Sequence, residues 1–272
     1  MKVTLIGGGN MARALVGGLI ARGRPPDTLA VVEIDPEARA TVAARFRVTT
    51  FAAIEAPSVA EADLVVIAVK PQNVRTVARE LSGLLTSQVV LTIAAGIRLA
   101  DLARWLGGYR RLVRAMPNTP ALIGAGVAGL YALPGVDSEG RTRAASVLEA
   151  VGGTLWCERE EDLDAVTGIS GSGPAYVFYF LEALDAAARE LGFAPADARR
   201  LALATFSGAI RLAEQSDSEP AMLRAQVTSK GGTTERGIAV LEEARVRDAL
   251  LAAVRAAADR AREMGELFGG EG

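Results

Sequence analysis

The sequence contains no histidine and only one cysteine, Cys157, and these two shortages restrict its chemistry. Without histidine there is no Ser-His-Asp triad, no histidine general base and no histidine-ligated zinc. A single cysteine cannot form an intrachain disulfide, which favours a reducing compartment. Catalysis must therefore use Lys, Tyr, Ser, Thr, carboxylates or a cofactor, and we expect no metal site.

A strong net charge and long hydrophobic runs are also missing. The formal net charge is −2, which gives no electrostatic reason to expect nucleic acid or an anionic membrane as a partner. No apolar run approaches the roughly 18 residues of a membrane-spanning helix. The amino terminus enters a strand pattern at once, without the features of a signal peptide. We therefore expect a soluble cytoplasmic protein.

The chain does contain a large apolar fraction, which is arranged in two patterns. Half of the 272 residues are hydrophobic, enough for a sizeable core. Up to about residue 160, short apolar runs alternate with helical spacing, which favours an α/β fold with a Rossmann-type, doubly wound, mostly parallel sheet. Beyond that point only helical spacing remains. We therefore predict a dinucleotide-binding domain over 1–160, an all-helical substrate-binding and dimerisation domain over 161–268, and a disordered tail over 269–272.

Individual elements follow from the same periodicity. Strands are predicted over 3–6, 29–34, 64–69, 89–94, 111–116, 127–131 and 154–156. Helices are predicted over 11–22, 36–45, 74–85, 99–106, 139–151, 174–191, 196–214, 220–227, 234–243 and 246–268. The helix over 174–191 is apolar around much of its circumference, so we expect it to be buried against a partner chain in a dimer.

A glycine-rich turn follows the first predicted strand and opens the first helix. It has the pattern Gly-x-Gly-x-x-Ala on Gly7, Gly9 and Ala12. In this context the first glycine makes the tight turn, the second lets a pyrophosphate touch the backbone, and a small third residue lets helix and strand pack closely. The turn therefore predicts a cofactor-binding segment made of Gly7, Gly8, Gly9, Asn10, Met11 and Ala12.

The second predicted strand ends in two acids, Glu33 and Asp35. An acid at this place usually bonds the ribose 2′-hydroxyl of NADH and repels the 2′-phosphate of NADPH. We assign cofactor binding here to Asp35, which favours NADH. Arg39 and Arg22 could neutralise the acid, so NADPH and NADH both remain open.

Later strands end in small or turn-forming residues, and ligands of doubly wound sheets gather at such strand ends. We predict cofactor contacts from two groups, which are Ala68, Val69, Lys70 and Pro71 after one strand and Ala94, Ala95 and Gly96 after the next. The first group would contact phosphate or ribose, and the second would leave space for a nicotinamide ring. Asn118 and Thr119 follow a further strand and either bond the loop backbone or face the substrate.

A second glycine turn lies near the carboxyl end, in the segment from Ser229 to Thr234, just before a helical pattern. The first amides of a helix have no internal partners and lie at the positive end of its dipole. Such a helix start can bind a carboxylate or phosphate. Thr234 is placed either to cap the helix or to donate its hydroxyl to a ligand, and a plain capped turn is the alternative.

Together these segments resemble the pyrroline-5-carboxylate reductase family. The resemblance covers nearly the whole chain and rests on residues 6–12, 68–72, 94–96, 114–121, 167–176 and 227–242. Departures from the family pattern occur at Lys230, Gln226 and Asp35. Some members have asparagine where this chain has Gln226, which leaves the glycine–threonine pattern intact. The family often has proline where this chain has Lys230, which leaves the role of Lys230 open. Members that favour NADPH often carry serine near the strand end where this chain has Asp35.

The resemblance implies reduction of 1-pyrroline-5-carboxylate to L-proline with NADPH or NADH, the last step of proline biosynthesis. It implies a helical dimerisation domain, dimers often assembled into decamers, and a substrate site at the domain junction that the partner chain completes. It further implies that the substrate carboxylate is received by Ser229, Gly231, Gly232, Thr233 and Thr234. Thr234 would lie near the ring nitrogen as the catalytic residue.

The lack of histidine fits this reaction, because a protonated cyclic imine is already electrophilic and accepts a hydride without a general base. We expect Thr234 to orient the ring and donate a hydrogen bond, since a hydroxyl is a poor acid. One alternative is a β-hydroxyacid dehydrogenase, but residues 174–191 lack the lysine base it needs. The other is a non-catalytic NAD(P)-sensing protein, which has no need of the second turn.

Overall fold

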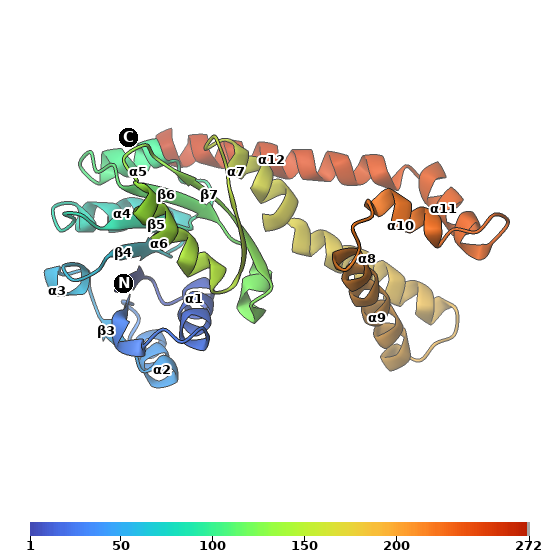
Figure 1. The fold of residues 1–272 in the computed structure, drawn as a ribbon, viewed down its shortest axis with the longest axis horizontal. Helices are drawn as coiled ribbons and strands as arrows, with labels where there is room; N and C mark the ends of the chain where they lie inside the picture. Colours follow the sequence, from blue (N-terminus) through green and yellow to red (C-terminus); the bar gives the residue numbers. More distant parts are fainter. Residues whose placement is uncertain (271–272) are drawn as a thin grey trace. The chain divides into compact units, whose positions relative to one another are not determined.

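The computed structural model describes residues 1–270 and divides the chain into two compact units (Figure 1). The first unit contains Met1–Ser172 together with the C-terminal segment from Val254, and the second is Gly173–Ala253. The first unit thus runs past the predicted limit at residue 160. The reason is that helix α7 (Asp162–Val166) packs on the sheet, with Leu163 fully buried.

The first unit is built on an eight-stranded sheet with the order β3-β2-β1-β4-β5-β6-β7-β8. Neighbouring strands are parallel except for the antiparallel pair β6 and β7. The predicted doubly wound, mostly parallel sheet is therefore confirmed. Its strands are β1 (Val3–Ile6), β2 (Leu29–Val32), β3 (Thr49–Phe51), β4 (Leu64–Ile67), β5 (Val89–Thr92), β6 (Leu112–Met116), β7 (Gly126–Ala132) and β8 (Gly152–Trp156).

Helices cover both faces of the sheet, which explains why β1, β4 and β5 are buried at every position. Leu5 and Val66 belong to one core cluster, whereas Ile67 and Val90 belong to the cluster on the other face. The helices of this unit are α1 (Asn10–Ala21), α2 (Pro36–Phe46), α3 (Ala56–Val59), α4 (Pro71–Leu81), α5 (Leu99–Trp105), α6 (Ser138–Glu149) and α7, with 3-10 turns η1 (Pro26–Thr28) and η2 (Thr119–Ile123) and a π-helical turn η3 (Thr167–Gly171).

The last helix, α12 (Val246–Gly270), brings the carboxyl end of the chain back to the first unit, where it lies beside α5 in Figure 1. The Arg104 guanidinium donates to the Gly269 carbonyl at 2.9 Å. Gly269 and Gly270 are therefore helical, and the predicted disorder is wrong for these two residues because α5 holds the helix end. Positions 271–272 lie outside the described residues.

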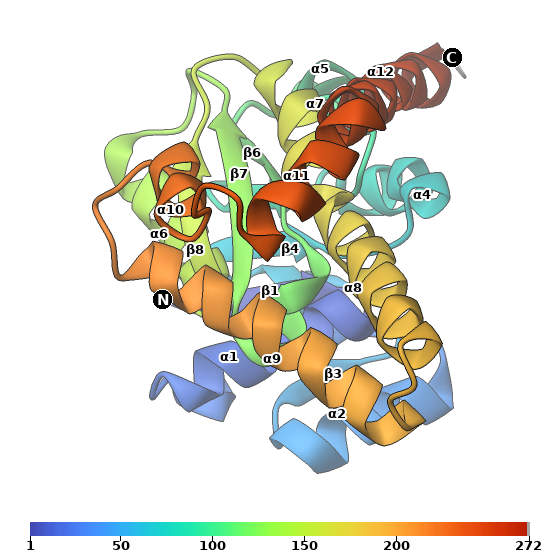
Figure 2. The same ribbon diagram turned by 90° about the vertical axis from the view of Figure 1, so that its right-hand side faces the viewer.

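The second unit contains only helices: α8 (Gly173–Glu190), α9 (Pro195–Glu214), α10 (Pro220–Gln226), α11 (Thr233–Glu243) and the first part of α12. Figure 2 shows α9 turning back from the end of α8. Large apolar side chains of α8 stay exposed, including Phe178 at 58% and Tyr179 at 72%. A single chain leaves such a face uncovered, which is typical of an association surface. Within residues 1–270, no helix is both long and apolar enough to span a bilayer.

Candidate active site

The first glycine turn joins β1 to α1 at the carboxyl edge of the sheet. Gly7 has φ +102°, a conformation that favours glycine. Its N–H donates to the Val32 carbonyl at 2.8 Å, and a Cβ at this position would lie 2.8 Å from the Ala68 carbonyl oxygen. Any side chain at Gly7 would therefore strain the turn and collide with the end of β4.

The third glycine of this turn is the N-cap of α1. Gly9 provides no side-chain cap, the first turn of α1 has no acid, and a Cβ at Gly9 would have nothing within 4 Å. The helix start thus combines open space with unpartnered amides and a positive dipole end. Ala12 is 1% exposed and packs in the core below. These residues fit the pyrophosphate of a dinucleotide.

The two acids after β2 have different partners. Asp35 is the N-cap of α2, and its Oδ1 accepts from the Ala38 amide at 2.7 Å. The carboxylate of Glu33 instead lies across the glycine turn and accepts from the Gly8 amide at 2.7 Å. Glu33 is therefore the acid that faces the turn, and the predicted assignment to Asp35 overlooked it.

The two arginines that could neutralise an acid here are separated by the structure. Arg39 donates from Nη1 to the carbonyls of Glu33 at 2.8 Å and Ile34 at 3.3 Å, so it lies at the end of β2. Arg22 is the C-cap of α1, a helix of 12 residues. It is therefore roughly 18 Å along the helix from the turn and belongs to the opposite edge of the sheet.

The strand ends predicted to contact the cofactor lie along the same edge as the turn, since β4 and β5 run parallel to β1. Ala68 and Val69 follow β4 beside Gly7, and exposed Lys70 is the N-cap of α4 with Pro71 in its first turn. Ala94, after β5, is buried and Ala95 is half-buried.

Gly96 lies against helix α12, a contact that the sequence did not indicate. It has φ +72°, and a Cβ there would lie 3.0 Å from the Cβ of Met264 and 3.2 Å from the ring of Phe268, both on α12. The close approach of α12 therefore accounts for this glycine.

Asn118 bonds main chain on both sides of its amide. Its Nδ2 donates to the Ser170 carbonyl at 3.2 Å, and its Oδ1 accepts from the Val127 amide at 2.9 Å. Of the two roles left open by the sequence, the structure has Asn118 holding η3 against the start of β7. Thr119 is exposed and begins η2.

The second glycine turn lies in the second unit and begins α11. Gly231 has φ +72°, and Gly232 is the N-cap without a side-chain cap. A Cβ at Gly232 would lie 2.4 Å from the Oγ of Ser229, whose carbonyl accepts from the Gly232 amide at 3.0 Å. Gly231 is thus favoured by its positive φ, and Gly232 by the tight approach to Ser229.

Thr233 and Thr234 occupy the first two positions of α11, so neither is its N-cap. Both are exposed, and within residues 1–270 the hydroxyl of Thr234 has no hydrogen bond. Of the two roles that the sequence left open for Thr234, capping is excluded, and its hydroxyl and the first amides of α11 remain available to an anion.

One residue that bonds this turn was not predicted from the sequence. Glu235, the third residue of α11, reaches back and accepts from the Gly231 amide at 2.6 Å. An acid three residues after a helix N-cap is a known capping signal and could have identified it. The amide of Gly231 is therefore already occupied by a carboxylate.

Other chemistry is not supported by the remaining residues. Burial, assisted by the nearby Asp162 carboxylate, raises the pKa of the Cys157 thiol, which keeps it protonated and unreactive at neutral pH. Residues 1–270 hold no cluster of His, Cys, Asp or Glu that would suit a metal ion.

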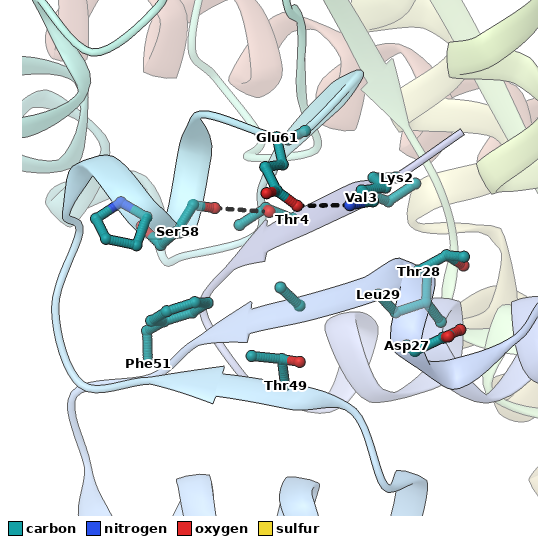
Figure 3. A pocket seen from close by; sticks show the side chains of 13 residues that line it. Lys2, Val3, Thr4, Asp27, Thr28, Leu29, Thr49, Phe51, Ser58 and Glu61 are labelled. Atoms are coloured by element: carbon teal, nitrogen blue, oxygen red, sulfur yellow. Dashed lines mark hydrogen bonds and ion pairs between the residues drawn. The ribbon is translucent and has the colours of Figure 1, made fainter.

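A small cavity of about 100 Å³ lies beside the first residues of β2 and β3, at the opposite edge from the glycine turn (Figure 3).

Several known proteins resemble this chain over nearly its whole length. A pyrroline-5-carboxylate reductase of Pseudomonas aeruginosa is 43% identical over 270 residues, covering 97% of this chain and 98% of that protein. The structure of a Coxiella burnetii pyrroline-5-carboxylate reductase has a TM-score of 0.91 at 38% identity, and that of Plasmodium falciparum pyrroline carboxylate reductase with NADP bound has 0.86 at 26%. Each covers 97% of this chain and 98% of the other.

The glycine turn at the carboxyl edge of a doubly wound sheet, followed by a helical unit, defines an oxidoreductase that binds a nicotinamide dinucleotide. Residues 160–264 match the family described as pyrroline-5-carboxylate reductase dimerisation, and residues 2–96 match NADP oxidoreductase coenzyme F420-dependent. The chain belongs to the pyrroline-5-carboxylate reductase family. It is an NAD(P)H-dependent oxidoreductase of proline biosynthesis with a self-association domain.

Proposed function

We propose that this protein reduces 1-pyrroline-5-carboxylate to L-proline with the cofactor held at the first glycine turn and the imine held at the second. The observation that carries the proposal is the start of α11, where exposed Thr233 and Thr234 follow a glycine N-cap. A small ligand with a carboxylate beside a ring nitrogen matches a helix start that ends in a free hydroxyl.

The carboxylate of the substrate binds the first amides of α11 and the hydroxyl of Ser229. The Gly231 amide is engaged by Glu235 and the Gly232 amide by the Ser229 carbonyl, which leaves the amides of Thr233 and Thr234 as donors. Hydrogen bonds to a charged group are worth roughly 1.5–3 kcal/mol each. Gly231 and Gly232 act by shaping the turn, because any side chain would displace Ser229 or strain the backbone.

The hydroxyl of Thr234 donates a hydrogen bond to the ring nitrogen of the neutral imine and accepts one from its N–H once the ring is protonated, which fixes the orientation of the C=N bond. The bound dihydronicotinamide supplies the hydride, and Gly9 with the amides of α1 holds its pyrophosphate. A protonated imine needs no general base, so the protein contributes position and charge rather than proton abstraction. Water at this exposed turn supplies the proton that the product amine carries.

Oxidation of NADH and NADPH should be followed with pyrroline-5-carboxylate and without substrate, and reduction of NAD+ and NADP+ should be followed with 3-hydroxy acids. We expect turnover with the imine alone. Turnover of 3-hydroxy acids would instead identify a β-hydroxyacid dehydrogenase, and binding of cofactor without any turnover would identify an NAD(P)-sensing protein.

Mixing two inactive variants tests whether a partner chain completes the site, as the resemblance implies. Gly9→Asp places a carboxylate where the pyrophosphate binds, and Thr234→Ala removes the hydroxyl. In a symmetric dimer assembled from equal amounts, half of the dimers are mixed and each has one intact composite site, so we expect about 25% of wild-type activity.

The two variants should be refolded together and assayed against each one refolded alone. Mixed samples no more active than the separate variants would show that both turns act within one chain and would contradict the proposed shared site.

Neutralising Glu235 is expected to strengthen substrate binding. Glu235→Gln keeps an oxygen for the Gly231 amide but removes a negative charge from the start of α11, where an anion binds. We expect the KM for the imine to fall by about 2- to 5-fold at low salt, with kcat nearly unchanged.

Glu243→Gln, at the far end of the same helix, is the control and should leave KM unchanged. A KM for Glu235→Gln that is unchanged or higher would mean that the carboxylate of the substrate binds elsewhere.

We further propose a cytoplasmic enzyme whose dimers assemble into decamers. The single cysteine supports the location, and the resemblance supports the assembly. Sedimentation at micromolar concentration would reveal the size of the assembly, and a folded, active monomer would contradict it.

A further inference from the structure

We infer that Glu33 is the residue that selects the cofactor, and that it makes this enzyme prefer NADH to NADPH. The inference rests on the proposed use of a nicotinamide dinucleotide at the first glycine turn. It concerns one carboxylate, which the fold holds beside that turn, and its effect on a ribose 2′-hydroxyl or a 2′-phosphate.

Both oxygens of the Glu33 carboxylate are fixed by main-chain amides. Oε2 accepts from Gly8 at 2.7 Å and Oε1 accepts from Asp35 at 2.9 Å. The lack of a side chain at Gly8 makes this possible, since a Cβ there would lie 3.1 Å from Oε2 and 3.3 Å from the Cβ and Cγ of Glu33. The carboxylate is therefore part of the glycine turn although it comes from another strand.

The backbone of Glu33 is also held at the end of β2 by pairing with neighbouring strands. Glu33 directly follows Val32, the last residue of β2, and its N–H donates to the Phe51 carbonyl of β3 at 3.0 Å. Ile6 and Val32 are paired in register, so the ends of β1 and β2 lie side by side. The side chain is half-buried, and a dinucleotide on this turn meets it without rearrangement of the strands.

An ionised carboxylate only accepts hydrogen bonds. The two hydroxyls of an adenosine ribose can donate to it, whereas a 2′-phosphate is an anion and is repelled at short range. The carboxylate of Asp35 is bonded to the start of α2 rather than to the glycine turn, so it does not face the cofactor as Glu33 does. The charge that discriminates between the two cofactors is therefore that of Glu33.

Two arginines near the glycine turn have part of their hydrogen-bonding capacity taken up by main-chain carbonyls, and the neighbouring side chain is apolar. Arg39 is bonded to the carbonyls of Glu33 and Ile34, and the Nε of Arg13 donates to the Gly8 carbonyl at 2.8 Å. Ile34, the residue between the two acids, is 80% exposed and has no polar group. A phosphate would therefore meet the remaining N–H groups of these arginines beside the carboxylate of Glu33.

Direct binding to the enzyme without substrate tests the inference. The Kd values of NADH and NADPH should be measured by nicotinamide fluorescence, and those of 5′-AMP and adenosine 2′,5′-bisphosphate by calorimetry. Wild-type enzyme should bind NADH at least about tenfold more tightly than NADPH. In Glu33→Gln, the Kd of NADH should rise by about tenfold, while the Kd of NADPH should fall by about threefold or more.

Asp35→Asn is the matched control, because it also removes one carboxylate charge and asparagine remains a good N-cap. Its ratio of Kd values should stay within about twofold of wild type. In every variant, the Kd of adenosine 2′,5′-bisphosphate should change in the same direction as that of NADPH, and the Kd of 5′-AMP in the same direction as that of NADH.

Three results would overturn the inference. The first is wild-type enzyme that binds NADPH as tightly as NADH. The second is a Glu33→Gln variant in which binding of both cofactors weakens equally, which would indicate a purely structural role. The third is an Asp35→Asn variant that shifts the ratio of the NADH and NADPH Kd values instead. Selective NADH binding without reduction of the imine would contradict the proposed function alone. Faster imine reduction with NADPH than with NADH would contradict the role of Glu33 alone.

Discussion

Thr234→Ala is expected to lower kcat/KM for pyrroline-5-carboxylate by about 10²-fold or more, as the loss of an aimed hydrogen-bond donor does. Thr234 is the second residue of α11 and is exposed, and its side chain does not cap the helix. The variant should therefore fold normally and bind cofactor as the wild type does. Steady-state kinetics together with cofactor fluorescence would measure both properties.

Two further variants separate the hydroxyl from the size of the side chain. Thr234→Ser keeps the hydroxyl and should retain most of the activity. Thr233→Ala removes a neighbouring hydroxyl from the same turn and should have a much smaller effect. A Thr234→Ala enzyme with an unchanged rate would remove Thr234 from the mechanism.

Arg114→Met is expected to cause the largest loss of stability, about 3–5 kcal/mol, because breaking a buried ion network leaves uncompensated charges. Arg114 lies on β6, and its side chain is 5% exposed. It contacts Glu160 at 3.1 Å and Asp164 at 3.3 Å, and Glu160 also accepts from the Leu99 amide at 2.8 Å. Calorimetry should record a fall in Tm of roughly 6–20 °C.

An exposed ion pair provides the control for Arg114. Arg260 lies 2.8 Å from Glu263 on α12, with 60% of its side chain exposed. Arg260→Met should change Tm by less than about 2 °C, since exposed pairs contribute little. Adding Glu160→Gln and Asp164→Asn to Arg114→Met should restore part of the loss. A small effect of Arg114→Met alone would mean that water solvates the two carboxylates.

Much of the first unit could be predicted because its core strands are short, continuous apolar runs. The strand expected over 64–69 is β4, with all four residues buried, and that expected over 3–6 is β1. The sequence did not indicate β3, because three residues are too few to establish a period. It also did not indicate that α12 returns to the first unit, since contacts between distant segments leave no local pattern.

The sequence by itself determined which backbone positions need glycine and which chemistry remains without histidine. Gly7 and Gly231 both have positive φ, and that requirement can be recognised from local spacing alone. Only the tertiary structure decided which acid faces the first turn. Asp35 caps its own helix while Glu33 reaches the neighbouring loop. The reason is physical: the direction of the Glu33 side chain depends on the pairing of β1 with β2, which brings the Gly8 amide of a loop distant in sequence beside it.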